Sequence, residues 1–88
     1  MKIPRNVSGE QLAQLLTLYG YRITRQTGSH MRLTTILRGE HHVTIPRHNP
    51  LRIGTLSGVL SDVAVHLKVS KEELVRELFK GYQASSKK

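Results

Sequence analysis

Apolar residues between positions 12 and 19 recur at intervals of three and four, which is the spacing of one helix face: Leu12, Leu15, Leu16 and Tyr19. Residues 8–11, Ser-Gly-Glu-Gln, precede them and have the form of a capping box. Gly20 follows as a C-terminal stop. The pattern therefore predicts a first helix from about residue 9 to residue 19, with its apolar face buried.

The next part of the chain alternates between apolar and polar residues, as half-buried strands do. Three segments show this alternation: residues 21–27, 30–38 and 41–46. Gly28-Ser29 and Gly39 supply the turns between them, because glycine adopts the positive φ that tight hairpins need. Pro46 has no N–H to donate and ends the last strand. We therefore expect a three-stranded antiparallel sheet.

The period of two assigns each side chain to one of the two sheet faces. The face expected to be buried carries Tyr21, Ile23, Met31, Leu33, Leu37, His41, Val43 and Ile45. The opposite face is polar and basic, with Arg22, Thr24, Gln26, His30, Arg32, Thr34, His42 and Thr44. Arg25 falls on the apolar register near a strand end. There its stem covers the edge of the core, or its guanidinium contacts a phosphate beside the turn.

Helical spacing returns after the strands, at Leu56, Val59, Leu60 and Val63, and predicts a second helix over residues 54–67. Residues 70–73, Ser-Lys-Glu-Glu, form another capping box before a third helix that carries Leu74, Val75, Leu78, Phe79 and Tyr82. A single antiparallel sheet with all helices on one face buries these stripes most simply. The expected fold class is α+β, with one domain over residues 1–83 and a disordered tail over residues 84–88.

Charge narrows the possible partners of this small chain. Its 88 residues include 14 Lys and Arg against 6 Asp and Glu, which gives a formal net charge of +8. Such a surface is typical of a nucleic-acid-binding protein, and an acidic protein partner fits it equally well. No apolar run has the length of a signal peptide or of a membrane span, so we expect a cytoplasmic protein with no membrane partner.

The chain offers few ligands for a metal. It has no Cys, which excludes disulfides and thiolate metal sites. His41 and His42 are neighbours in a strand, so they point to opposite faces and cannot chelate one ion together. The same reasoning places Ser29 and His30 on opposite faces, which argues against a nucleophile–base pair. No metal or other cofactor is expected.

Three segments together carry a resemblance to a known family: KIPRNVSGEQL, RQTGSHMRL and HHVTIPRHNPLRIGTLSGVL. They closely resemble the HicA family of bacterial toxins, which are small RNA-cleaving members of toxin–antitoxin pairs. The likeness covers about residues 1–67. Its most specific feature is the Gly-Ser-His triplet, placed between a capped helix and a Pro-x-His...Gly-Thr-Leu segment.

The resemblance implies a double-stranded-RNA-binding-domain-like fold and metal-independent cleavage of mRNA. It also implies that the histidine after Gly28-Ser29, here His30, is the catalytic residue, and that a cognate HicB-type antitoxin inhibits the enzyme. We expect this antitoxin to cover the active site, because the exposed basic face attracts an acidic partner. The third helix extends beyond the shortest family members. It completes the core or contacts the antitoxin.

A histidine on an exposed strand has chemistry that suits this role. Neutral imidazole accepts the proton of an RNA 2′-hydroxyl, and imidazolium protonates the departing 5′-oxygen. We favour the general base, and one such group contributes typically about 10²–10⁴ in rate, which predicts a slow nuclease. We expect RNA contacts from Arg25, Ser29, Arg32, Arg47 and His48.

Other interpretations of these residues remain open at this point. Arg32 is equally a solvated strand charge. Arg47 and His48 lie in the loop before the second helix, where they contact an anion or merely pack and cap. The whole basic face also suits a non-catalytic RNA-binding module that only docks phosphates, or a protein that chiefly binds an acidic partner.

Overall fold

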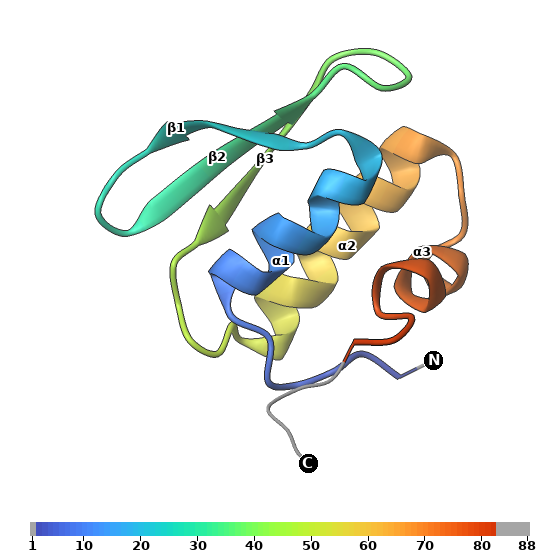
Figure 1. Cartoon of the computed structure of the whole chain (residues 1–88). Coiled ribbons are helices and arrows are strands. Elements are labelled where there is room, and N and C mark those ends of the chain that lie inside the picture. The colour runs from blue at the N-terminus through green and yellow to red at the C-terminus, as the bar shows by residue number, and fades with distance from the viewer. Residues whose placement is uncertain (1, 83–88) are drawn as a thin grey trace.

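A computed structural model of the chain describes residues 2–82 and has the expected order of elements (Figure 1). These are α1 (Gly9–Leu16), a short 3-10 turn η1 (Thr17–Tyr19), β1 (Arg22–Gln26), β2 (His30–Thr35), β3 (His41–Pro46), α2 (Ile53–Leu67) and α3 (Lys71–Leu78). The architecture is α+β and agrees with a double-stranded-RNA-binding-domain-like fold. The tail expected over residues 84–88 lies outside the described residues.

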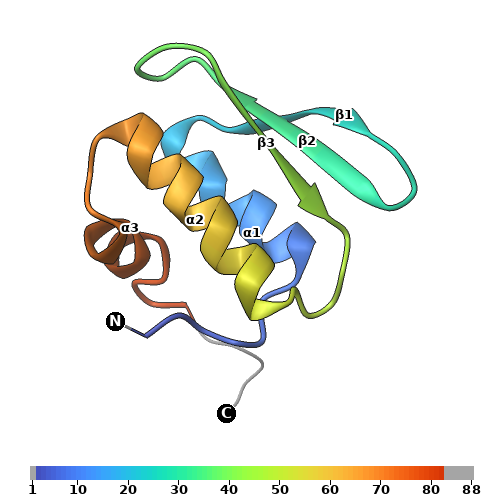
Figure 2. The ribbon, with the colours of Figure 1, turned by 180° about the vertical axis from the view of Figure 1, so that it is seen from behind.

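The three strands form one antiparallel sheet in the order β1-β2-β3. Figures 1 and 2 show α1 and α2 side by side on one face of this sheet, whereas no helix within residues 2–82 covers the other face. The core between sheet and helices includes Val7, Leu12, Leu16, Tyr21, Met31, Leu33, Ile45, Leu56, Leu60 and Val63. In the described part of the chain, no helix combines the length and apolarity needed to cross a bilayer.

Helix α3 completes the core, which settles one of the two roles left open for it. Leu74, Val75 and Leu78 are buried, and α3 packs against α2. Its first turn is capped by Ser70, whose hydroxyl accepts the Glu73 N–H at 3.0 Å. The reciprocal bond of the predicted capping box, from the Ser70 N–H to the Glu73 side chain, is not formed among residues 2–82. An antitoxin contact is not needed to explain this helix.

The start of α1 is pressed against the end of β3. The predicted capping box is present: the Ser8 hydroxyl accepts the Gln11 N–H at 3.0 Å, and the Gln11 side chain accepts the Ser8 N–H at 2.8 Å. A Cβ on Gly9 would lie 2.1 Å from the Pro46 carbonyl oxygen, so no larger residue fits. The Gly9 N–H donates to the His48 carbonyl at 2.9 Å, which joins the loop after β3 to this helix.

Strand β1 departs from the predicted alternation because it contains a β-bulge. The register shifts between Ile23 and Arg25, so that Arg25 lies opposite Arg32 and Gln26 lies opposite Met31. A bulge adds one residue to a strand and reverses the faces of the residues after it. The prediction that Arg25 lies on the apolar side is therefore wrong. The expected half-burial of this edge strand is also wrong, since all five of its residues are exposed.

Strand β2 ends at Thr35, three residues earlier than predicted. Thr35 occupies the core position and is buried; its hydroxyl donates to the Tyr19 carbonyl at 2.8 Å and accepts the Leu37 N–H at 3.1 Å. Because both bonds satisfy the hydroxyl, its burial costs little. Leu37 was expected on the apolar face but is 45% exposed in the turn that follows.

A cluster of polar rings joins the sheet to α2. The Tyr21 hydroxyl is buried and lies 2.7 Å from His41 Nδ1. The His41 ring stacks on His66 with ring centroids 4.4 Å apart, and His66 Nε2 donates to the Leu37 carbonyl at 2.8 Å. Burial, and secondarily the carboxylate of Asp62, raise the pKa of Tyr21 to about 12.

We expect Gly9→Ala to lower the free energy of unfolding by about 1–3 kcal/mol, because its methyl group overlaps the Pro46 carbonyl and forces α1 away from β3. Urea denaturation measures this loss. Gly58→Ala is the matched control, since no atom lies near its Cβ and alanine stabilises a helix interior by about 0.5–1 kcal/mol. Equal stabilities of the two variants would contradict the close contact at Gly9.

The raised pKa of Tyr21 predicts a loss of stability at high pH. Because the folded protein holds this proton up to about pH 12 and the unfolded chain releases it near pH 10, the free energy of unfolding falls as pH rises between these values. Urea denaturation across this window measures the fall. In Tyr21→Phe the fall should be shallower, and an unchanged pH slope in that variant would refute the assignment.

Candidate functional site

The residues predicted to bind RNA gather at one end of the open sheet face. Along β2, Arg32 lies opposite Arg25 of β1 and Thr44 of β3, and His30 lies opposite Pro46. Side chains of directly opposed residues share a face, so Arg25 and Arg32 are adjacent there. His30, Arg25 and Arg32 are all exposed. The structure therefore brings His30 together with two of the five expected RNA contacts, Arg25 and Arg32.

His30 is held by a closed turn at the head of β2. Its N–H donates to the Thr27 hydroxyl at 3.1 Å, and its carbonyl accepts the Thr27 N–H at 2.9 Å. Its ring nitrogen Nδ1 lies 2.8 Å from the Ser29 hydroxyl. The expectation that Ser29 and His30 point to opposite faces is wrong, because Ser29 lies in the bend before the strand, where alternation does not apply.

The contact with Ser29 orients the His30 ring and determines which role is left to Nε2. When Nδ1–H donates to the Ser29 oxygen, Nε2 keeps a lone pair and accepts a proton. When the Ser29 hydroxyl instead donates to Nδ1, Nε2 carries the proton and acts as a donor. The serine thus orients the ring in either protonation pattern, a positioning role that the sequence reasoning missed.

Arg25 and Arg32 form a pair of like charges across neighbouring strands. Direct opposition of like charges destabilises a sheet. Within residues 2–82, neither guanidinium makes an ion pair. A phosphate between them would offset their repulsion and accept bonds from both. The alternating pattern of the sequence does not predict this pair, because it places Arg25 on the apolar face. Only the bulge brings Arg25 to the open face.

The loop after β3 borders the same end of the sheet. The Arg47 N–H donates to the Ser29 carbonyl at 2.8 Å, and the Arg47 guanidinium pairs with Glu10 at 3.0 Å. The His48 side chain is exposed, and its carbonyl accepts the Gly9 N–H. Arg47 and His48 are therefore fixed to the first turn of α1, whereas the sequence had suggested the start of α2. Both lie close to the turn that holds His30.

His41 and His42 lie on opposite faces of the sheet, as predicted. His41 contacts Tyr21 on the core side. On the open face, His42 Nδ1 lies 2.7 Å from the Thr34 hydroxyl and His42 Nε2 lies 2.9 Å from Glu40. Among residues 2–82, no three His, Cys, Asp or Glu side chains are placed to hold a metal ion.

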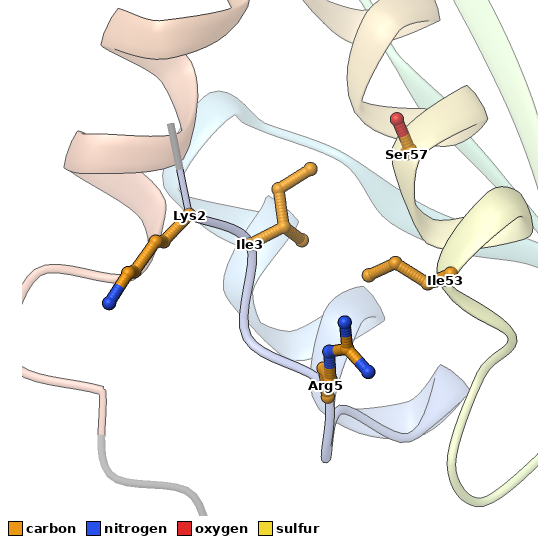
Figure 3. A pocket seen from close by; sticks show the side chains of 5 residues that line it. All are labelled: Lys2, Ile3, Arg5, Ile53 and Ser57. Carbon is orange, nitrogen blue, oxygen red and sulfur yellow. The ribbon is translucent and has the colours of Figure 1, made fainter.

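A hollow of about 420 Å³ lies away from the sheet, between the N-terminal segment and the start of α2. Figure 3 shows the residues that line it: Lys2, Ile3, Arg5, Ile53 and Ser57. The Arg5 guanidinium faces this space, whereas the Lys2 amine points away from it (Figure 3). The two cations do not converge, and none of the predicted site residues lies here, so we place the candidate site on the sheet.

Comparison with known proteins points to one family. A family model described as the HicA toxin of bacterial toxin–antitoxin systems matches residues 9–65, which is more than half of the chain and includes His30. The search of curated proteins found no match. The search of solved structures found none either.

Proposed function

The chain belongs to the HicA toxin family and is a toxin of a toxin–antitoxin system, and on this premise we propose that it is a metal-independent endoribonuclease that cleaves mRNA with His30 as its catalytic residue. The observation that carries this proposal is the exposed His30 ring, oriented by Ser29 and placed beside the Arg25–Arg32 pair. The reaction uses no cofactor and takes place in the cytoplasm.

Cleavage proceeds by attack of the RNA 2′-oxygen on the neighbouring phosphorus. His30 Nε2 takes the proton of the 2′-hydroxyl as the new oxygen–phosphorus bond forms. The bond from phosphorus to the 5′-oxygen then breaks, and solvent supplies the proton that this oxygen acquires. His30 then releases its proton to solvent, which closes the cycle. The products are a 2′,3′-cyclic phosphate and a 5′-hydroxyl end, so atoms and charges balance without a redox partner.

The cations around His30 position the phosphate and stabilise its developing charge. Arg25 and Arg32 offer two guanidinium groups on the face that carries the imidazole. Arg47 and His48 bind the RNA where it passes beyond the end of the sheet. Ser29 keeps the His30 ring in place.

The antitoxin partner that the family implies acts on the same surface. A HicB-type antitoxin with acidic and apolar groups covers the open face and blocks access to His30. Opposite charge speeds such an encounter, because long-range attraction steers the two proteins together. Inhibition by masking requires no change in the fold of the toxin.

We expect His30→Ala to lower the single-turnover cleavage rate of a defined RNA by about 10²–10⁴, which is the usual contribution of one general base. The variant should remain folded, because the side chain is exposed. His48→Ala is the matched control: it weakens RNA binding but keeps the rate at saturating protein. Wild-type cleavage by a folded His30→Ala protein would remove His30 from catalysis.

RNA affinity should fall steeply with salt, since each phosphate contact on a single strand contributes about −0.7 to the slope of log affinity against log salt. Fluorescence anisotropy of labelled RNA with the His30→Ala protein measures this slope without cleavage. Arg25→Ala and Arg32→Ala should each make it shallower by about 0.7. Arg76→Ala, an exposed position on α3, removes the same charge and should leave the slope unchanged. An equal salt slope in the His30→Ala protein and in its three arginine variants would refute the phosphate site.

A further inference from the structure

The open sheet face has a second hollow at the end away from His30. It encloses about 800 Å³ and is lined by Gly20, Arg22, Thr24, Thr34, Thr35, Ile36, Leu37 and Arg38. The turn before β2 and the loop after it lie at opposite ends of the sheet (Figure 1). Thr34 and His30 are four residues apart on β2, which corresponds to about 13 Å along the strand. The hollow is therefore separate from the cleavage site, but three of its lining residues, Arg22, Thr24 and Thr34, lie on the same face as His30.

A chain of hydrogen bonds joins Thr24 and Thr34, which line this hollow, to the ring of His42 beside it. Thr24 Oγ1 lies 2.8 Å from Thr34 Oγ1, which lies 2.7 Å from His42 Nδ1. His42 Nε2 lies 2.9 Å from Glu40. A carboxylate only accepts, so Nε2–H donates to Glu40, and Nδ1 shares a hydrogen bond with the Thr34 hydroxyl. His42 is thus held in one orientation, with its ring on the open face.

Two arginines border the hollow without a partner among residues 2–82. Neither Arg22 nor Arg38 makes an ion pair there. Arg38 also adopts a φ of 59°, in the left-handed region that costs a non-glycine residue about 1–2 kcal/mol. Glycine or asparagine would fit that turn position with less strain. Both arginines are exposed, so their guanidinium groups are available to an anion.

The rest of the lining suits a nucleobase. Ile36 and Leu37, which are 84% and 45% exposed, give an apolar wall. The three threonine hydroxyls are already bonded within the protein, so they do not demand polar partners from a ligand. Histidine rings stack on unpaired bases, and arginines bind the phosphates on either side of them.

We propose that this hollow is a second RNA subsite, which holds a single-stranded nucleotide about 13 Å from the phosphate at His30. Arg22 and Arg38 bind its phosphates, and His42 stacks on its base. This inference rests on the proposed RNA cleavage and extends it, because a strand that spans both sites is bound more tightly than a short one. Arg25 and Arg32 lie between the two sites on the same face, and these cations support one RNA ligand over a separate protein partner.

The test compares RNAs that reach one or both sites. The probes are a dinucleotide, whose single phosphate cannot reach both sites about 13 Å apart, and a single-stranded RNA of about 16 nucleotides, which can. We expect Arg22→Ala and Arg38→Ala to lower kcat/KM for the long RNA more than for the short one. Each should also reduce the salt slope of long-RNA binding by about 0.7. Arg76→Ala is again the charge-matched control and should change neither quantity.

Variants of His42 separate stacking from charge. His42→Ala should weaken long-RNA binding by about fivefold or more, the usual effect of losing one stacked base. His42→Phe keeps an aromatic ring and should retain most of the affinity. An equal loss in both variants would overturn the stacking role.

The outcomes separate this subsite from the proposed function. If the protein cleaves RNA but Arg22→Ala and Arg38→Ala behave like Arg76→Ala, the subsite is wrong and the His30 mechanism stands; this is also the result expected if the hollow docks a protein. If purified protein cleaves no RNA, the proposed function fails. Anisotropy with the long RNA then decides the subsite alone: a selective loss in the Arg22 and Arg38 variants upholds it, and no selective loss overturns it.

Discussion

The contact between Gly9 and Pro46 is the constraint on which the site geometry depends. A Cβ at position 9 would come within 2.1 Å of the Pro46 carbonyl oxygen, so the first turn of α1 and the end of β3 approach as closely as backbones allow. Pro46 is the β3 residue opposite His30. The next residue, Arg47, donates its N–H to the Ser29 carbonyl. The same few atoms therefore fix the helix, the exit of β3 and the turn that orients the imidazole.

Stability and chemistry are assigned to different faces of the sheet. The helices cover one face and bury the apolar side chains, whereas Arg22, Arg25 and Arg32 lie on the other face, where water solvates them. The opposed Arg25 and Arg32 illustrate the difference: their repulsion opposes folding slightly, and it makes the surface ready for an anion. A chain with a net charge of +8 tolerates such a face because its core lies on the far side of the sheet.

The sequence pattern predicted the order of elements, the bounds of β3 and the open position of His30, since these follow from periodicity and from capping residues. It failed where tertiary contacts override the period. The bulge in β1 reverses Arg25, and no residue in that segment distinguishes a bulged strand from a regular one. Thr35 replaces an apolar residue in the core because two backbone groups happen to satisfy its hydroxyl. Ser29 reaches the His30 ring because it lies in a bend, where strand alternation has no meaning.

Helix α3 lies beyond the matched residues 9–65, yet it buries three side chains in the common core. A small domain buries a modest fraction of its surface, so each added apolar contact is a sizeable part of its stability. That contribution comes from residues remote from the sheet face. Because His30, Arg25 and Arg32 are exposed and add little to the core, substitutions there change the chemistry of the face with little effect on stability. The open face therefore carries charges that could not be buried in the core.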